Sequence, residues 1–180
     1  GQLPHLFHRR QGAQARTFSG LEPDLLSQGA RDQQDVGEDN GRVEAEPAPV
    51  ERTLDAMHAA ASRADGEAYF ATFMPDGRFI GTDATERWTL SEFRAYAMPY
   101  FSQGKGWTYR PVTRTVTIAP IDCRCVAWFD EVLDNDAYGT TRGSGVLRRT
   151  EDGWKIEQYV LSFAVPNDRA RAVVGAIKAD

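Results

Sequence analysis

The sequence contains few side chains that could transfer protons, and two neighbouring carboxylates stand out among them. Asp130 and Glu131 are adjacent within the strand-like run Cys123–Leu133. Because successive residues of a strand point to opposite faces, only one of the two can face a cavity. A carboxylate inside an aromatic cavity loses solvation, which raises its pKa and suits it to general acid or base catalysis. We take Asp130 as the first catalytic candidate. An ion pair with Arg142 is the alternative role.

Asp83 is the second catalytic candidate, because it ends the short strand predicted over Arg78–Asp83. The alternative is an ordinary one, in which Asp83 starts a turn that runs to Glu86.

Histidine chemistry in the domain rests on one residue. Of the three histidines, His5 and His8 lie near the N-terminus, and His58 follows Leu54 by one helical turn. An unperturbed histidine titrates near neutral pH, so His58 could act as an acid or base in a pocket. It could equally sit at the edge of the core, bonded to water or backbone. A single histidine does not predict a metal site, and we expect no metal and no cofactor.

Aromatic residues could line a binding pocket for a flat, apolar molecule, and together with His58 they form the predicted ligand-binding set. That set comprises Trp88, Tyr96, Trp128, Tyr159 and His58. The alternative is that these side chains simply fill the core, as most aromatic residues do.

Composition excludes some partners. The 180 residues carry a net charge of −5, and no cluster of Lys and Arg interleaves with aromatic residues. Without a basic stripe to neutralise phosphates, we predict no nucleic-acid partner. No apolar run reaches the length of a transmembrane helix, so we predict no membrane association and a cytoplasmic location. Because the chain begins at Gly1 rather than Met, a removed export signal stays an alternative.

The two cysteines, Cys123 and Cys125, lie in a strand-like run. Side chains two apart on a strand are roughly 6.5–7 Å apart, whereas a disulfide needs Cβ atoms about 4 Å apart. We therefore expect two buried thiols rather than a disulfide.

Domain organisation follows from a change in composition. Residues 1–49 are rich in Gln, Gly, Asp, Glu and Arg, so they bury too little apolar surface to offset chain entropy, and we predict a flexible or disordered arm. Residues 50–180 form the predicted domain. It begins with an amphipathic helix over Val50–Arg63 and a short helical segment over Glu67–Phe73. A third helix, with Thr89 or Ser91 as its N-cap, is predicted to run to Ser102, and the spacing of Thr89 and Glu92 fits a capping box.

The last third of the chain is rich in strands. Turn-forming residues separate four β-runs of about ten to twelve residues, Trp107–Ile118, Cys123–Leu133, Tyr138–Arg149 and Trp154–Val165. Such short connections allow only antiparallel neighbours. A final helix is predicted over Arg169–Lys178. The fold class is therefore α+β, with a cone-shaped, curved antiparallel sheet, a four-strand meander plus a short strand, packed against N-terminal helices.

This order of elements, over roughly Val50–Val165, resembles the nuclear transport factor 2-like superfamily with its cystatin-like fold, and in particular its SnoaL-like members. The most specific stretch is the strand end Gly145–Arg149, followed by Asp152-Gly153-Trp154-Lys155-Ile156 and then Ser162. The same segment is similar to the association domain of calcium/calmodulin-dependent kinase II. Many relatives have histidines where this chain has Gln158 and Val160, so no histidine-dependent property transfers. The resemblance implies frequent homodimers.

The resemblance to the kinase association domain favours one face of the sheet as the lining of the cone. That face carries Trp128 and Asp130, beside Glu157, Tyr159 and Leu161. The opposite register would present Phe129 and Glu131, with Ile156, Gln158 and Ser162. Both faces of the last strand are largely apolar, so periodicity alone leaves the register open.

Three functions are compatible with this fold, because the superfamily hosts several. The favoured one is a domain that binds an unknown small, apolar molecule in the mouth of the curved sheet. The first alternative is a metal-independent isomerase, dehydratase or hydrolase that uses a pocket carboxylate as general base. The second alternative is a dimerisation or association module.

Overall fold

A computed structural model describes residues 47–179. The predicted arm, residues 1–49, lies outside the described residues except at its end, where α1 already begins at Ala48. The helices and strands are α1 (Ala48–Ser62), α2 (Gly66–Ala71), β1 (Phe73–Ile80), β2 (Arg87–Thr89), α3 (Leu90–Phe101), β3 (Arg110–Ile118), β4 (Val126–Asn135), β5 (Gly139–Thr150), β6 (Gly153–Phe163) and α4 (Ala170–Ile177). This is the predicted α+β plan.

Local sequence signals explain where the helices begin. Pro49 lies in the first turn of α1, where the missing N–H of proline costs no hydrogen bond. The Asp65 side chain caps α2 by accepting a hydrogen bond from the Ala68 N–H. The predicted capping box of α3 is present, with Thr89 and Glu92 each accepting a hydrogen bond from the other's backbone N–H.

The six strands form one mixed sheet in the order β2-β1-β6-β5-β4-β3. Strands β3 to β6 make the predicted antiparallel meander. The sheet is not antiparallel throughout, because β1 pairs with β6 in parallel. A parallel pair needs a long connection, and α3 with strands β2 to β5 supplies it. The short strand β2, which pairs with β1, was not predicted.

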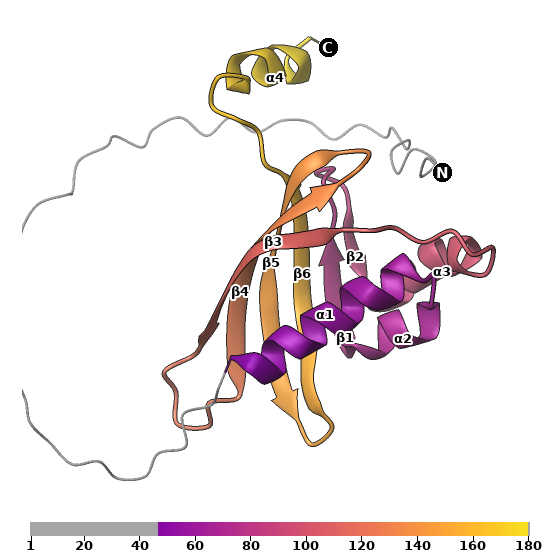
Figure 1. The fold of residues 1–180 in the computed structure, drawn as a ribbon, viewed down its shortest axis with the longest axis vertical. Coiled ribbons are helices and arrows are strands. Elements are labelled where there is room, and N and C mark those ends of the chain that lie inside the picture. The colour runs from indigo at the N-terminus through magenta and orange to yellow at the C-terminus, as the bar shows by residue number, and fades with distance from the viewer. Residues whose placement is uncertain (1–46, 180) are drawn as a thin grey trace, which may run out of the picture. The chain divides into compact units, whose positions relative to one another are not determined.

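The core lies between the sheet and the helices. Helix α1 lies across one face of the curved sheet, as Figure 1 shows. Its predicted apolar stripe is confirmed, since Val50, Leu54, Met57 and Ala61 are all buried. Leu147 of β5 and Ile156 of β6 are completely buried on the sheet side. Burying such a side chain stabilises the fold by about 1.5–3 kcal/mol.

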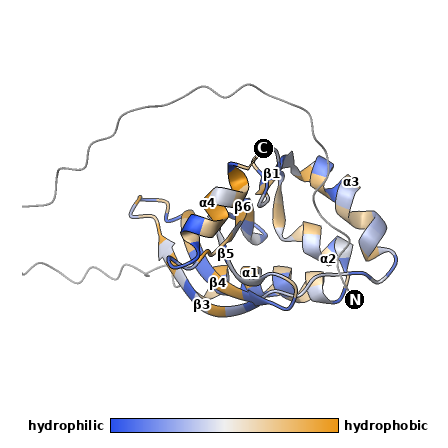
Figure 2. Ribbon diagram, turned by 90° about the horizontal axis from the view of Figure 1, so that it is seen from above, coloured by the Kyte–Doolittle hydropathy of each residue, from blue (hydrophilic) through white to orange (hydrophobic). Residues whose placement is uncertain are grey.

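The register of the sheet is opposite to the favoured prediction along β4. Buried and more exposed residues alternate along this strand. Hydropathy does not follow that alternation, because the buried Glu131 is hydrophilic, and Figure 2 shows hydrophilic and hydrophobic segments mixed along β3 and β4. Phe129, Glu131 and Leu133 face the core, whereas Trp128 is 45% exposed and Asp130 is exposed. The Trp128/Asp130 face is therefore the outer face.

A β-bulge in β6 brings residues of both predicted faces to the interior. In β6, Ile156 pairs with Leu147 and Gln158 pairs with Val146, so Glu157 is the extra residue. The bulge puts both Ile156 and Tyr159 among the buried residues, although they are an odd number of positions apart. A strict two-residue period therefore assigns half of this strand to the wrong face.

The two cysteines form a disulfide, contrary to the prediction from strand geometry. They lie in the connection between β3 and β4, not in a strand as that prediction assumed. Arg124 between them has a left-handed backbone with a φ of 43°. This turn brings the two Cα atoms to 5.1 Å, within the range that a disulfide spans.

The C-terminal helix α4 is confirmed close to its predicted bounds, and none of its residues is buried. Its apolar side chains Val173, Val174 and Ile177 are exposed. Among residues 47–179, no helix is both long enough and apolar enough to cross a membrane.

We predict that Leu54→Ala destabilises the domain by about 2–5 kcal/mol, because Leu54 is completely buried under the sheet and its removal leaves a cavity. The free energy of unfolding from urea titration measures the effect. Val112→Ala is the matched control, since Val112 is 64% exposed, and we expect a change below about 0.5 kcal/mol. Equal effects of the two substitutions would contradict this account of the core.

Candidate functional site

A buried carboxylate on the inner face of the sheet is the centre of the polar interior. The side chain of Glu131 is 0% exposed. Its Oε1 accepts hydrogen bonds from Nε2 of His58 at 2.8 Å and from the hydroxyl of Tyr159 at 2.9 Å. Its Oε2 accepts one from Nε of Arg114 at 2.8 Å. We refer to His58, Arg114, Glu131 and Tyr159 as the Glu131 network.

Each member of the network is placed by the fold. Glu131 faces inward with Phe129 and Leu133 because β4 alternates. Arg114 is its direct partner on the neighbouring strand β3. His58 reaches it from α1, which crosses the sheet, and Tyr159 reaches it from β6, one strand beyond β5.

The strand between Glu131 and Tyr159 leaves room for their contact. Gly143 of β5 pairs with Glu131 on one side and with Leu161 on the other. A Cβ atom at Gly143 would collide with the Tyr159 hydroxyl and would come within 2.9 Å of Oε1 of Glu131. A glycine is therefore required for the hydrogen bond between Tyr159 and Glu131 to cross β5.

Arg114 connects the buried carboxylate to the surface. Its Nη1 donates a hydrogen bond to Oδ1 of Asp55 at 2.7 Å, and the Asp55 side chain is 65% exposed. The Arg114 guanidinium thus lies between two carboxylates, one buried and one exposed. This arrangement ties α1 to β3 and compensates the buried charge of Glu131.

Charges within the network set its protonation. Burial alone would raise the pKa of Glu131, but the hydrogen bond and charge of His58, together with Arg114, hold that pKa below its ordinary value. The pKa of Tyr159 is raised well above its ordinary value, first by burial and then by the negative charge of Glu131. Glu131 is therefore ionised at neutral pH, and Tyr159 stays a hydrogen-bond donor.

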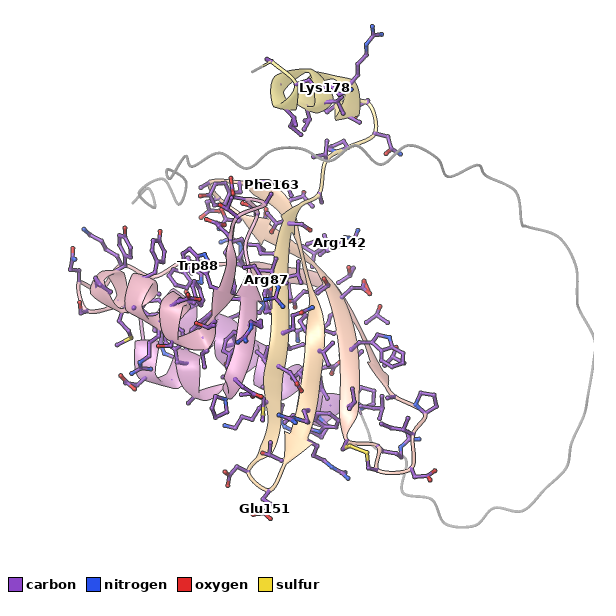
Figure 3. The ribbon with its side chains drawn as sticks, turned by 180° about the vertical axis from the view of Figure 1, so that it is seen from behind. Arg87, Trp88, Arg142, Glu151, Phe163 and Lys178 are labelled. Atoms are coloured by element: carbon purple, nitrogen blue, oxygen red, sulfur yellow. A yellow bond between two sulfur atoms is a disulfide. The ribbon has the colours of Figure 1, made fainter. Side chains whose placement is uncertain are left out.

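Aromatic side chains extend from the network towards the edge strand β2. Phe79 lies 5.9 Å from Tyr159 and stacks on Phe93 at 4.1 Å, measured between ring centroids. Trp88 contacts Phe93 and lies 4.7 Å from Tyr96 of α3. In Figure 3, Trp88 lies on β2 beside α3. Both Trp88 and Tyr96 are half-buried, so this end of the series is accessible.

A second buried carboxylate lies at that accessible end. Glu86, which precedes β2, is 8% exposed, and burial raises its pKa. Among residues 47–179, no Lys, Arg or His side chain has a nitrogen within 4.0 Å of the Glu86 carboxylate. Burial, followed by the nearby Tyr100, raises the pKa of Tyr96 to about 12. Glu86 thus differs from Glu131, whose charge is compensated.

A buried hydroxyl on β5 has no hydrogen-bond partner among residues 47–179. Thr141 is 0% exposed, and its Oγ1 makes no hydrogen bond within the described residues. Thr141 lies two residues before Gly143, so both residues share the inner face with the Glu131 network. An unpaired buried hydroxyl costs about 1–3 kcal/mol, which is why such groups usually bond to water or a ligand.

The structure separates the predicted site residues into three groups. His58 and Tyr159 meet at Glu131, and Trp88 and Tyr96 contact each other. The other three lie at the surface: Trp128 and Asp130 on the outer face of β4, and Asp83 in the exposed loop before β2.

The two predicted catalytic carboxylates lack the desolvation on which that prediction depended. Asp130 is 54% exposed and lies 4.0 Å from Arg142, which is the alternative role considered above. The carboxylate of Asp83 accepts hydrogen bonds from the side chain and backbone of Thr85, which lower its pKa. Both arrangements suit surface residues.

Sequence reasoning missed Arg114, Thr141 and Glu86, and it placed Glu131 only in the alternative register. The alternation Phe129-x-Glu131-x-Leu133 was an available signal, because the two-residue period of a strand places Glu131 on the same face as two apolar residues. Among residues 47–179, no group of three or more His, Cys, Asp or Glu side chains could hold a metal ion.

The fold is that of the nuclear transport factor 2-like class. A protein from Streptomyces avermitilis, proposed to be a dehydratase of that class, superposes with a TM-score of 0.55 at 14% identity, over 66% of this chain and 96% of the other. A proposed ketosteroid isomerase from Shewanella frigidimarina gives 0.50 at 18% identity, over 63% and 94%. A proposed calcium/calmodulin-dependent protein kinase II association domain from Xanthomonas campestris gives 0.50 at 18% identity, over 69% and 91%.

Within that class, the model of the SnoaL-like domain matches residues 50–166. The chain therefore belongs to the SnoaL-like family. No curated protein matches the sequence. The identities to the solved structures are low, so those structures share the fold of this chain and do not identify its ligand or reaction.

We predict that Glu131→Gln lowers the free energy of unfolding at pH 7 by about 3 kcal/mol, because it removes the negative charge that compensates the Arg114 guanidinium. The substitution should also reduce the change in the free energy of unfolding between pH 7 and pH 3. Since the folded pKa of Glu131 is depressed, its contribution is present above about pH 4.5 and is lost as the pH falls towards the folded pKa.

Urea unfolding between pH 7 and pH 3 measures both effects. Asp130→Asn is the matched control, because it removes the neighbouring carboxylate from the exposed face of the same strand. We expect the control to change stability by less than about 1 kcal/mol. A Glu131→Gln variant that loses as much stability on acidification as the wild type would contradict the role given to Glu131.

Proposed function

We propose that this SnoaL-like domain binds a small, largely apolar molecule on the inner face of its sheet, with one polar group of the molecule bonded to Thr141. The unpaired, fully buried Thr141 hydroxyl is the observation that supports this proposal most directly. The half-buried pair Trp88 and Tyr96 would contact an apolar or aromatic part of the ligand. Mostly apolar surroundings with a few polar groups are typical of small-molecule sites.

The contrast between the polar groups supports a ligand over a purely structural interior. Every oxygen of Glu131 already has a protein donor, so Glu131 needs nothing further. Thr141 has no hydrogen-bond partner in the described part of the chain. Glu86 accepts a hydrogen bond from the backbone N–H of Asp83 at 3.4 Å, but no cation among the described residues pairs with it. Ligand binding would supply the missing hydrogen bond at Thr141, and Glu86 could hold a second polar group of the molecule.

We predict that Thr141→Val stabilises the ligand-free domain by about 1 kcal/mol, because valine has a similar volume and removes an unpaired buried hydroxyl. The free energy of unfolding after removal of bound molecules by refolding measures this. Thr115→Val, on the exposed side of β3, is the control and should change little. A Thr141→Val variant less stable than the wild type by 1 kcal/mol or more would mean that the hydroxyl is bonded within the protein, and would overturn the proposal.

The ligand itself can be sought by native mass spectrometry of the purified chain. We predict that an adduct, or binding of the fluorescent probe 8-anilinonaphthalene-1-sulfonate, weakens at least tenfold in Trp88→Ala and is unchanged in Trp128→Ala. The two tryptophans provide a matched pair, because Trp88 packs against Tyr96 whereas Trp128 lies on the outer face. Equal binding by the two variants would place the ligand elsewhere.

The buried His58–Glu131 hydrogen bond supports a second candidate function, an enzyme that transfers a proton without a metal. A histidine oriented by a carboxylate is the usual arrangement of a general base. Here His58 replaces Asp130 and Asp83 as the candidate acid or base, and Tyr159, whose hydroxyl donates to Oε1 of Glu131, helps to hold that carboxylate in place. The same inner face would hold the substrate.

Proton transfer can be tested with any compound that the binding experiment identifies. In D₂O, the wild-type protein should exchange an acidic C–H proton of the compound for deuterium, and NMR measures the rate of that exchange. The His58→Gln substitution should slow the exchange at least 100-fold. Asp130→Asn should leave the rate unchanged. Exchange that is equally fast with His58→Gln would refute the catalytic role, while leaving the binding proposal to its own experiments.

The predicted homodimer stays a prediction.

A further inference from the structure

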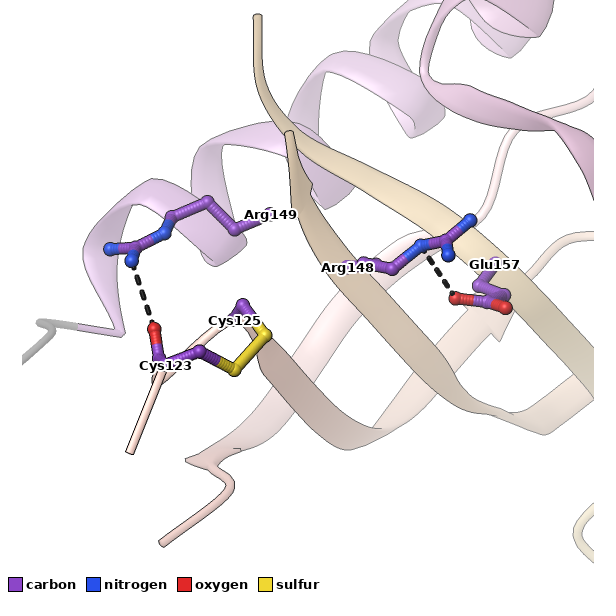
Figure 4. The surroundings of a disulfide bond; sticks show 5 residues. All are labelled: Cys123, Cys125, Arg148, Arg149 and Glu157. Atoms are coloured by element: carbon purple, nitrogen blue, oxygen red, sulfur yellow. Dashed lines mark hydrogen bonds and ion pairs between the residues drawn. A yellow bond between two sulfur atoms is a disulfide. The ribbon is translucent and has the colours of Figure 1, made fainter. Parts of the chain in front are cut away.

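The disulfide between Cys123 and Cys125 lies in the connection from β3 to β4, in a part of the fold separate from the inner face. Figure 4 shows the bond beside Arg149, whose Nη2 donates a hydrogen bond to the Cys123 carbonyl oxygen at 2.9 Å. Only Arg124 separates the two cysteines in the chain. Cys123 is exposed, and Cys125 is half-buried.

The bond contributes little as a cross-link. In the chain-entropy account, a disulfide stabilises a protein by restricting the unfolded chain, and this effect grows with the length of the loop that it closes. A loop with one residue between the cysteines is close to the shortest possible. The hairpin is in any case held by the full antiparallel ladder of β3 and β4. Stabilisation of the fold therefore does not explain the bond.

The closed loop also holds Arg124 in an unfavourable conformation. Its φ of 43° is in the left-handed region, which a residue with a Cβ atom adopts only at a cost. Opening the disulfide would allow Arg124 to relax to an ordinary backbone conformation. The backbone thus favours the reduced form, which makes this bond easier to reduce than an unstrained disulfide.

The surroundings suit attack by a thiolate from solution. Cys123 is an exposed residue, so we expect an external thiolate to approach the bond from its side. The guanidinium of Arg149 places positive charge beside Cys123, and nearby arginines stabilise thiolates. Ile121, two residues before Cys123, is 45% exposed and offers an apolar contact for an incoming molecule.

We propose that Cys123 and Cys125 form a redox-active pair that exchanges disulfide and dithiol with external thiols. An external thiolate attacks Sγ of Cys123, the bond between the two sulfurs breaks, and Sγ of Cys125 leaves as a thiolate that takes a proton from water. A second external thiol then resolves the mixed disulfide and releases Cys123. The two external thiols are oxidised to a disulfide, and the protein gains two electrons and two protons.

The test equilibrates the folded full chain with thiols and counts free cysteines by alkylation and intact mass. One arm uses the monothiol glutathione, and the other uses the dithiol dithiothreitol. We expect reduction without denaturant in both arms, and reduction by the dithiol alone would identify a dithiol as the partner chemistry. A pair that stays oxidised in both arms until urea unfolds the protein would overturn the proposal.

Arg124→Gly tests the origin of the reactivity, because glycine adopts a left-handed backbone freely. We expect the equilibrium constant for reduction to fall about fivefold in this variant, since the closed loop is no longer strained. Arg63→Gly, an exposed position at the end of α1, is the control and should leave the constant unchanged. An Arg124→Gly variant reduced as readily as the wild type would refute the strain argument.

Single-cysteine variants identify the sulfur that is attacked. With oxidised glutathione, Cys125→Ser should form the mixed disulfide at Cys123 several-fold faster than Cys123→Ser forms it at Cys125, because Cys123 is the more exposed. Urea unfolding of both variants confirms that the fold is retained. Faster reaction at Cys125 would contradict the proposed order of attack.

Discussion

The ionised Glu131 side chain is the constraint on which the interior depends. A buried carboxylate is tolerated only when donors surround it, and here the donors come from three separate elements. Helix α1 provides His58, β3 provides Arg114, and β6 provides Tyr159. These contacts require α1 to cross the sheet where His58 can reach Glu131, and they require a glycine at position 143. The curved sheet and its covering helix are thus held in register by one charge.

Satisfied and unsatisfied polar groups divide the inner face into regions with different roles. In the Glu131 network both carboxylate oxygens have protein donors, which stabilises the deep part of the domain, although Nη2 of Arg114 makes no hydrogen bond within the described residues. Thr141, by contrast, has no partner within residues 47–179, and Glu86 is buried without a cation close enough to form an ion pair. The aromatic series from Tyr159 through Phe79 and Phe93 to Trp88 runs from the Glu131 network towards the end of the domain that carries Glu86. The interior therefore combines a hydrogen-bonded carboxylate at Glu131 with a buried hydroxyl at Thr141 that lacks a partner among the described residues.

Much of the fold could be predicted because its signals are local. The stripe of α1, the capping box of α3 and the short turns of the meander each depend on residues close in sequence. The site depended on non-local features. The bulge at Glu157 reverses the inward face within one strand, and the left-handed Arg124 turns Cys123 and Cys125 towards each other. Neither leaves a periodic pattern, so the inner face and the disulfide were both misjudged.

The parallel pairing of β1 with β6 has a consequence for the order in which the protein folds. The hairpins of the meander join neighbouring segments, so their closure costs little chain entropy. Strand β1 must instead wait for β6, from which it is separated in the chain by β2 to β5 and α3. We expect β1, and with it β2 and the loop that carries Glu86, to dock late on a nearly finished sheet. The accessible end of the aromatic series would then be the last part of the domain to become ordered.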